Sequence, residues 1–297
     1  MPELPLLLSL PPDLLSLPPD LLTLSASKVK EKAALRLTCR ATRMAVGAAC
    51  TQLKWWGDKG AGPVSLTALL PASCPNIKLL NCVRMWESLV DRVGCPSTMQ
   101  TLICHDTGVA DLGPLAACTG LWTLNCDVTP VGDLGRLAAC TRLQALNCSN
   151  TKVANLVPLT AWTGLQTLEC NSTPVADLGP LAACTGLQTL CCGKTPVANL
   201  VPLAACMRLQ TLCCGGTKVA DLGPLAACTG LQTLSCCNTL VADLGPLAAC
   251  TGLQTLSRSD TEVADLGPLE ACTRLQSLWC VRTQVSDLSP LAAFPLL

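Results

Sequence analysis

The chain has 297 residues, of which 50% are apolar and only 13% charged, and 20 basic residues balance 20 acidic ones. This balance excludes a nucleic-acid binder that works through a basic surface, since such domains concentrate positive charge. One His, one Phe and no Tyr leave few groups for proton transfer or for base stacking.

The first 24 residues, MPELPLLLSLPPDLLSLPPDLLTL, are rich in Leu, but Pro and Asp interrupt every apolar run. A secretory signal needs about 7–15 uninterrupted apolar residues after a basic start, and a membrane helix needs about 20. We therefore expect no membrane association and a soluble chain in a reducing compartment. The cytoplasm is the expected location, with the nucleus as the second.

Residues 1–56 are predicted to form a small helical segment, because Leu35, Cys39 and Val46 recur near helical spacing opposite basic residues. The stretches Leu-Pro-Pro-Asp-Leu-Leu at 17–22 and Leu-Arg-Leu-Thr-Cys-Arg at 35–40 resemble an F-box, although the spacer is short and Thr42 replaces the usual Trp. This resemblance implies docking on the adaptor subunit of a cullin-type ubiquitin ligase. The residues that would make the contact are Leu17, Pro18, Leu21, Leu22, Leu35, Leu37, Cys39 and Arg43. The alternative is a helical cap over the first unit of a repeat array, whose apolar end must be covered.

Residues 57–76 are predicted to be a linker with a degenerate repeat, since GDKGAGP at 57–63 is rich in turn-forming residues. The sequence Ala-Cys-Thr-Gln-Leu at 49–53 looks like the end of another degenerate copy, with Leu53 at the first position of a unit.

From Ile77 to the end, about ten copies of a 22-residue unit follow, with the pattern L-Q-T-L-x-C-x-x-T-x-V-A-D-L-G-P-L-A-A-C-T-G. Positions 3 to 7 alternate, which predicts a short strand with every second residue inward. One unit cannot bury its Leu face alone, so we expect the units to stack into a parallel sheet. The Asp-Leu-Gly-Pro-Leu stretch predicts a capped 3₁₀ turn on the return path.

The unit resembles the 22-residue leucine-rich repeat of internalin-like proteins, L-x-x-L-x-L-x-x-N-x-I-x-D-I-x-P-L, over about three-quarters of the chain. The resemblance implies an α/β leucine-rich repeat solenoid over 77–297, with short parallel strands on the concave face and 3₁₀ turns or loops on the convex face. Two departures are Cys at the sixth position and Thr instead of Asn at the ninth. We expect this Thr to bridge neighbouring rungs, as a partial substitute for the Asn ladder of the family.

Most cysteines recur at positions 6 and 20 of the unit, where we expect inward-pointing, inert thiols that act as small hydrophobes. Spacing alone does not exclude bridges between rungs, but parallel inward side chains suit disulfide geometry poorly. Cys191, Cys213 and Cys237 fall on the outward positions 5 and 7. They are either a redox or metal patch or neutral drift at small-residue positions.

The concave face is predicted to bind a protein partner through its variable positions. The candidates are His105, Asn125, Asp127, Asn147, Ser149, Glu169, Asn171, Cys191, Cys213, Ser257, Trp279 and Arg282. Trp279 with Arg282 is the strongest candidate anchor, because binding hot spots favour Trp and Arg. Trp279 could instead only cover the last rung.

Two features depart from the pattern. Arg258 occupies an inward sixth position, so we expect a distorted rung or a side chain that reaches solvent. The chain stops at Leu297 in phase to begin another unit, which indicates a truncated sequence or an edge that pairs with another chain.

The function expected from the sequence is a non-enzymatic interaction scaffold that binds a protein partner, without cofactor, metal or nucleic acid. No nucleophile motif accompanies His105, and no Gly-rich phosphate loop or metal motif is present. The first alternative is the substrate-recruiting subunit of a cullin-based ubiquitin ligase. The second is an extracellular internalin-like adhesion protein.

Overall fold

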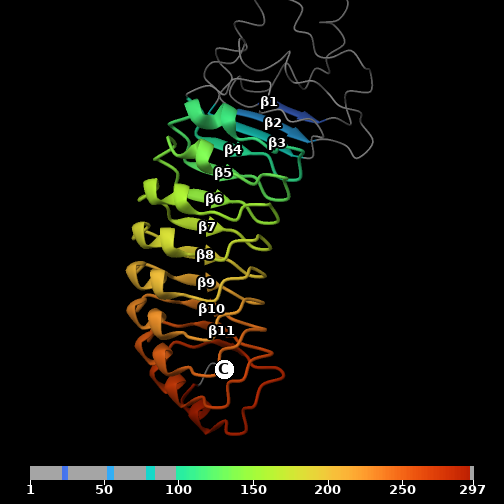
Figure 1. Cartoon of the computed structure of the whole chain (residues 1–297). Helices are drawn as coiled ribbons and strands as arrows, with labels where there is room; N and C mark the ends of the chain where they lie inside the picture. The colour runs from blue at the N-terminus through green and yellow to red at the C-terminus, as the bar shows by residue number, and fades with distance from the viewer. Residues whose placement is uncertain (1–21, 26–51, 57–77, 84–97, 295–297) are drawn as a thin grey trace, which may run out of the picture.

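The computed structural model describes residues 22–25, 52–56, 78–83 and 98–294, and in this part of the chain twelve strands form one sheet in chain order (Figure 1). All paired strands are parallel. The strands are β1 Leu22–Ser25, β2 Gln52–Trp56, β3 Leu79–Val83, β4 Thr101–Ile103, β5 Thr123–Asn125, β6 Ala145–Asn147, β7 Thr167–Glu169, β8 Thr189–Cys191, β9 Thr211–Cys213, β10 Thr233–Ser235, β11 Thr255–Ser257 and β12 Ser277–Trp279. The predicted stack of repeated units is confirmed.

Each rung from β4 to β12 returns through a short 3₁₀ helix, and these helices form a second column along the convex side of the stack (Figure 1). They are η4 Gly113–Ala117, η5 Gly135–Leu137, η6 Val157–Ala161, η7 Gly179–Ala183, η8 Val201–Ala205, η9 Gly223–Ala227, η10 Gly245–Ala249, η11 Gly267–Ala271 and η12 Ser289–Ala293.

The alternation that predicts the strands also sets their register. In β7, Leu168 is fully buried, whereas Thr167 and Glu169 on either side are half-buried. Equivalent positions of neighbouring units face each other, so that Leu190 pairs with Leu212. Each position of the unit therefore forms a straight column of side chains along the stack.

The aspartate at position 13 caps the 3₁₀ turn, as predicted. The Gly179 N–H donates to Asp177 Oδ1 at 2.7 Å, just before η7 begins. In the unit that carries Asn199 at this position, the Val201 N–H donates to the amide oxygen at 2.8 Å. This repeated bond satisfies a backbone donor at the helix start that has no partner within the helix.

The threonine at position 9 acts within its own rung, and the prediction that it bridges neighbouring rungs is wrong. Thr195 Oγ1 donates to the carbonyl of Cys192, three residues earlier, at 2.6 Å, and the same bond recurs from Thr107 to Thr239. The backbone supplies the links between rungs instead, as in the bond from Lys194 N to Gly215 O at 2.8 Å. A short hydroxyl closes a local turn more readily than it reaches the next unit.

The residues at position 8 lie in the left-handed region of backbone space. Their φ values fall between 52° and 57° for non-glycine residues, and only Gly216, at 71°, supplies the residue type that this conformation favours. Val128 is the most unfavourable occupant, since a β-branched side chain rarely adopts a positive φ.

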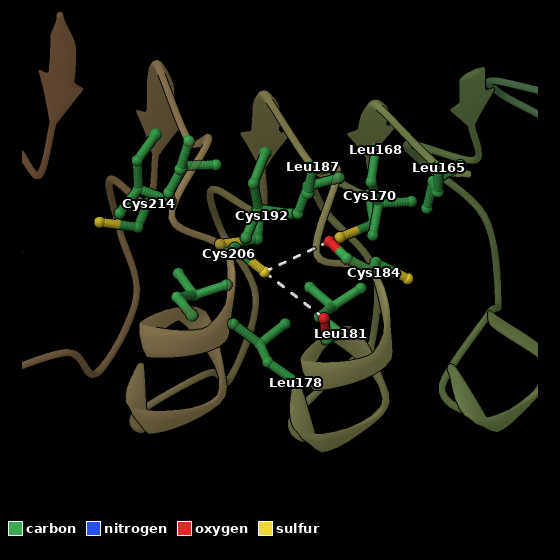
Figure 2. Packing of buried hydrophobic residues seen from close by; sticks show 14 of the residues in the cluster. Leu165, Leu168, Cys170, Leu178, Leu181, Cys184, Leu187, Cys192, Cys206 and Cys214 are labelled. Atoms are coloured by element: carbon green, nitrogen blue, oxygen red, sulfur yellow. Dashed lines mark hydrogen bonds between the residues drawn. The ribbon is translucent and has the colours of Figure 1, made fainter. Parts of the chain in front are cut away.

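The core is a column of leucines, valines and cysteines, and Figure 2 shows part of it along the stack, with labelled residues from Leu165 to Cys214. Every cysteine from Cys104 to Cys280 is a free thiol, and those at positions 6 and 20 are buried except Cys280. The position-20 thiols from Cys140 to Cys272 also make weak contacts between rungs. Cys206 Sγ, for example, donates to the carbonyls of Leu181 and Cys184 at 3.4 and 3.6 Å (Figure 2). Trp162 replaces one of these cysteines, and its indole N–H donates to the equivalent carbonyl, Leu137 O, at 3.3 Å.

Arg258 is fully buried in the core, and none of its three guanidinium nitrogens has a hydrogen-bond partner. Both expectations for it are therefore wrong. The side chain does not reach solvent, and β11 keeps the regular register with β10 and β12.

In the N-terminal segment 1–56, the described parts are the strands β1 and β2 rather than helices. Leu22, a predicted adaptor contact, begins β1 and pairs with Leu53, which in turn pairs with Leu80 at position 4 of its unit. Leu53 thus occupies position 4, so the predicted phase of the degenerate copy is wrong. The remaining F-box-like candidates, Leu17, Pro18, Leu21, Leu35, Leu37, Cys39 and Arg43, and the predicted linker 57–76, lie outside the described residues. Within the described residues, no helix has the length and apolar character needed to cross a bilayer.

Candidate functional site

The concave face consists of the outward side chains at positions 3, 5 and 7 of the rungs from β4 to β12. Because the strands are in register, position 5 forms one column and position 7 a second column beside it. The structure brings the predicted candidates into these columns: Asn125, Asn147, Glu169, Cys191, Cys213, Ser257 and Trp279 at position 5, and His105, Asp127, Ser149 and Asn171 at position 7.

Two candidates lie elsewhere or are inaccessible. Ser149 is buried, and its Oγ accepts hydrogen bonds from the backbone N and Nδ2 of Asn171, at 3.2 and 3.4 Å. Arg282 lies at position 8, beyond the strand, where its Nε pairs with Asp260 Oδ1 at 2.7 Å. Ser149 therefore holds the Asn171 side chain in place, and Arg282 forms an exposed ion pair with Asp260.

The N-terminal part of the concave face is polar and weakly acidic. Asn147 Nδ2 donates to Glu169 Oε2 on the next rung at 2.9 Å, and Asn171 Oδ1 accepts the Gly193 N–H at 2.8 Å. Asn125 Oδ1 accepts the Asp127 N–H at 3.0 Å. These bonds fix the side chains, so the surface presents carboxylates in defined positions instead of freely rotating groups.

The middle of the face carries the smallest side chains. Gly193 and Gly215 occupy position 7, and a Cβ on Gly193 would lie 3.1 Å from Gly215 O, a tight contact that a small shift of the neighbour would relieve. Beside them, Cys191 and Cys213 face each other across β8 and β9.

Interaction between the two facing thiols raises the pKa of Cys191 well above its ordinary value and lowers the pKa of Cys213 to about 7. Burial and the nearby Glu169 carboxylate oppose the lowering at Cys213. The buried thiols behave in the opposite way, since burial raises the pKa of Cys192 to about 12.

The C-terminal part of the face combines small hydroxyls with exposed apolar groups. Ser235 and Ser257 follow in the position-5 column, and Cys237 Sγ lies 2.9 Å from Ser257 Oγ. Trp279 is 51% exposed on β12, and Val281 beside it is 62% exposed. Trp279 therefore offers a large apolar surface to solvent.

Sequence reasoning did not include Ile103 or Ser235 among the candidates, although both occupy position 5. Strict application of the 22-residue period would have found them. It also missed the glycines at position 7, whose effect is to expose their neighbours. In the described part of the chain, no group of three or more His, Cys, Asp or Glu side chains is arranged to hold a metal ion.

Comparison with solved structures reveals likeness to internalins from Listeria monocytogenes. An internalin, InlF, from Listeria monocytogenes is similar with a TM-score of 0.79 and 25% identity, over 86% of this chain and 74% of that one. The internalin InlC2 from the same organism has a TM-score of 0.60 and 28% identity, over 63% and 81%.

The fold is that of a leucine-rich repeat solenoid. A third similar structure, the functional domain of Listeria InlJ, has a TM-score of 0.67 and 22% identity, over 83% of this chain and 56% of that one. The InlJ domain includes a cysteine ladder. No protein-family model and no curated protein matches the sequence.

Proposed function

We propose that the protein is a non-enzymatic scaffold whose leucine-rich repeat solenoid binds a protein partner on its concave face. The observation that carries this proposal is where the units differ. Core and capping positions are nearly constant, whereas the position-5 column runs from Asn and Glu through Cys and Ser to Trp on otherwise uniform rungs. A rigid surface with varied side chains is suited to recognising an extended partner.

The interaction is tested by charge reversal on the two sides of the stack. Glu169→Lys changes the concave face, and Glu270→Lys makes the same change on η11 of the convex side. Proteins captured by the full chain from its native source are compared quantitatively for the two variants. The proposal predicts at least one partner whose capture is lost with Glu169→Lys and kept with Glu270→Lys, whereas equal loss with both variants contradicts it.

Trp279 is the proposed anchor within this surface. Once a partner is known, Trp279→Ala should weaken binding at least about tenfold, because buried Trp contacts dominate many interfaces. Trp122 is 44% exposed and lies outside the position-5 and position-7 columns, so Trp122→Ala is the control. Equal affinity of both variants would show that Trp279 only covers the last rung.

The ubiquitin-ligase alternative rests on the F-box-like sequence at 17–43. It is tested by binding of the full chain to the F-box-binding adaptor subunit, with Leu35→Asp as the disrupted variant. Leu22 is avoided because it pairs in β1. Adaptor binding that Leu35→Asp abolishes would favour the ligase role. If the folded native chain does not bind the adaptor, only the scaffold function remains.

A further inference from the structure

A pair of accessible thiols lies in the middle of the concave face. Cys191 and Cys213 are direct register partners on β8 and β9, and the backbone links these strands through Cys192 N and Cys213 O at 2.8 Å. Both side chains are half-buried, whereas the next residues along the strands, Cys192 and Cys214, are completely buried. The alternation of the strand thus separates one reactive pair from the thiols of the core.

Access to this pair is open from the concave side. The next outward positions on the same two rungs are Gly193 and Gly215, which have no side chains. On the preceding rung the equivalent position holds Asn171. With glycine at both positions, the Cys191 and Cys213 side chains remain partly exposed on the concave side.

The distance between neighbouring strands also suits a covalent link. Paired strands lie about 4.8 Å apart, and disulfides join Cα atoms that are usually about 4.4–6.8 Å apart. The inward thiols are fully enclosed by the core, whereas Cys191 and Cys213 are partly exposed and face each other on paired strands.

We propose that Cys191 and Cys213 form an oxidative modification site, which hydrogen peroxide converts to a disulfide across the concave face. The Cys213 thiolate attacks one peroxide oxygen, the O–O bond breaks, and Cys213 becomes a sulfenic acid while the leaving hydroxide takes a proton to give water. The Cys191 sulfur then attacks the Cys213 sulfur, the S–O bond breaks, and the second oxygen leaves as water with the Cys191 proton. Two thiols lose two electrons and two protons, and one peroxide is reduced to two waters.

The chemistry of the pair supports this order of events. The thiolate is the nucleophile in such reactions, and interaction with the Cys191 thiol lowers the pKa of Cys213 while that of Cys191 is raised. Cys213 is therefore the more readily ionised thiol of the pair. The core thiols are poor competitors, since burial raises their pKa and excludes peroxide.

The test treats the folded full-length protein with a small excess of hydrogen peroxide, blocks remaining thiols with N-ethylmaleimide and maps the tryptic peptides. Cys213 falls in the peptide 209–218 and Cys191 in the peptide 153–194, so the disulfide joins two separate peptides. We expect this crosslink in the native chain and its loss in both Cys191→Ser and Cys213→Ser. In Cys191→Ser, the sulfenic acid on Cys213 persists and is trapped by dimedone.

Cys237→Ser is the matched control, because Cys237 is also half-buried on the concave face but lies beside a serine hydroxyl. This variant should form the crosslink between Cys191 and Cys213 at the native rate. In the native chain, Cys237 should oxidise to a disulfide more slowly than Cys213, because Gly215 and Ser259 occupy the equivalent position on the neighbouring rungs and offer no second thiol. The proposal is wrong if a folded chain forms no crosslink, if the crosslink persists in Cys191→Ser through Cys192, or if Cys237 oxidises as fast as Cys213.

Discussion

At the scale of single residues, the repeat imposes backbone conformations that are unfavourable for some of the residue types present. Position 8 requires a positive φ in every rung from β4 to β12, and it is filled by Asn, Asp, Ser, Lys and Arg, by Gly216, and by Val128. Left-handed backbone costs about 1–2 kcal/mol for residues other than Gly, and Asn and Asp tolerate it best. Val128 is half exposed and gains little from packing, so its strain is not offset.

Val128→Asn should therefore raise the free energy of unfolding by about 1 kcal/mol, measured by chemical denaturation. Asn150 and Asn238 already occupy the equivalent position in other units. The reverse change, Gly216→Val, should lower stability by about 1–2 kcal/mol. If both substitutions changed the free energy of unfolding in the same direction, strain at position 8 would not be the cause.

Arg258 is the second residue at odds with its position. Burial lowers the pKa of its guanidinium, and three nitrogens lack partners in the core between Cys236 and Cys280. Arg258→Cys restores the residue found at this position in the neighbouring units and removes the buried unpaired donors. We expect it to raise the free energy of unfolding by about 2 kcal/mol or more.

The matched control is Arg274→Cys, the same replacement at an exposed site, which should change stability by less than about 0.5 kcal/mol. Thermal and chemical denaturation of both variants measure these changes in the free energy of unfolding. A destabilised Arg258→Cys would show that the guanidinium has partners that offset its burial.

At the scale of elements, each rung depends on a few side chain to backbone bonds. Asp221 Oδ1 accepts the Gly223 N–H at 2.6 Å at the start of η9, and this cap recurs with Asn in two other units. The threonine at position 9 closes the turn that follows the strand in the same local way. The elements are thus stabilised within each unit, and leucine packing joins the units.

Asp221→Ala should lower the free energy of unfolding by about 1 kcal/mol, since it leaves the Gly223 N–H without its acceptor. Asp221→Asn keeps an amide oxygen in place and should cost less than about 0.5 kcal/mol. Urea titration of the two variants distinguishes them. Equal losses would mean that the carboxylate charge, and not the hydrogen bond, stabilises the turn.

The sequence predicted these elements well because the 22-residue period fixes both the alternation and the register. It failed where a local contact competes with the family pattern: the Thr195 hydroxyl reaches a carbonyl three residues away before it reaches another rung. It also failed at Leu53, because 27 residues rather than 22 separate it from its partner Leu80. On the concave face, the period located Asn125 and Glu169, but it could not show that Ser149 is buried and bonded to Asn171.

At the scale of the whole molecule, stability should be a sum over units and their contacts with direct neighbours. Deleting one complete unit, residues 209–230, joins two equivalent positions and preserves the register on both sides. We expect the circular dichroism spectrum of the shortened chain to keep its shape. The midpoint of thermal unfolding should fall, because one inter-unit interface is lost.

Deleting only residues 209–219 removes half a unit and places a strand position against a turn position. This control should give a chain that loses cooperative unfolding or aggregates. If it unfolds like the complete-unit deletion, the stack does not depend on the register of its rungs.

The columns of the concave face have a consequence for how such a protein can diversify. Each rung contributes its own side chains to the concave face, and the rungs are nearly identical at their other positions. Gain or loss of a unit shifts the concave side chains of all later rungs by about 4.8 Å relative to those of the earlier rungs. Duplication or deletion of one repeat therefore changes the arrangement of side chains on the concave face while the solenoid fold is kept.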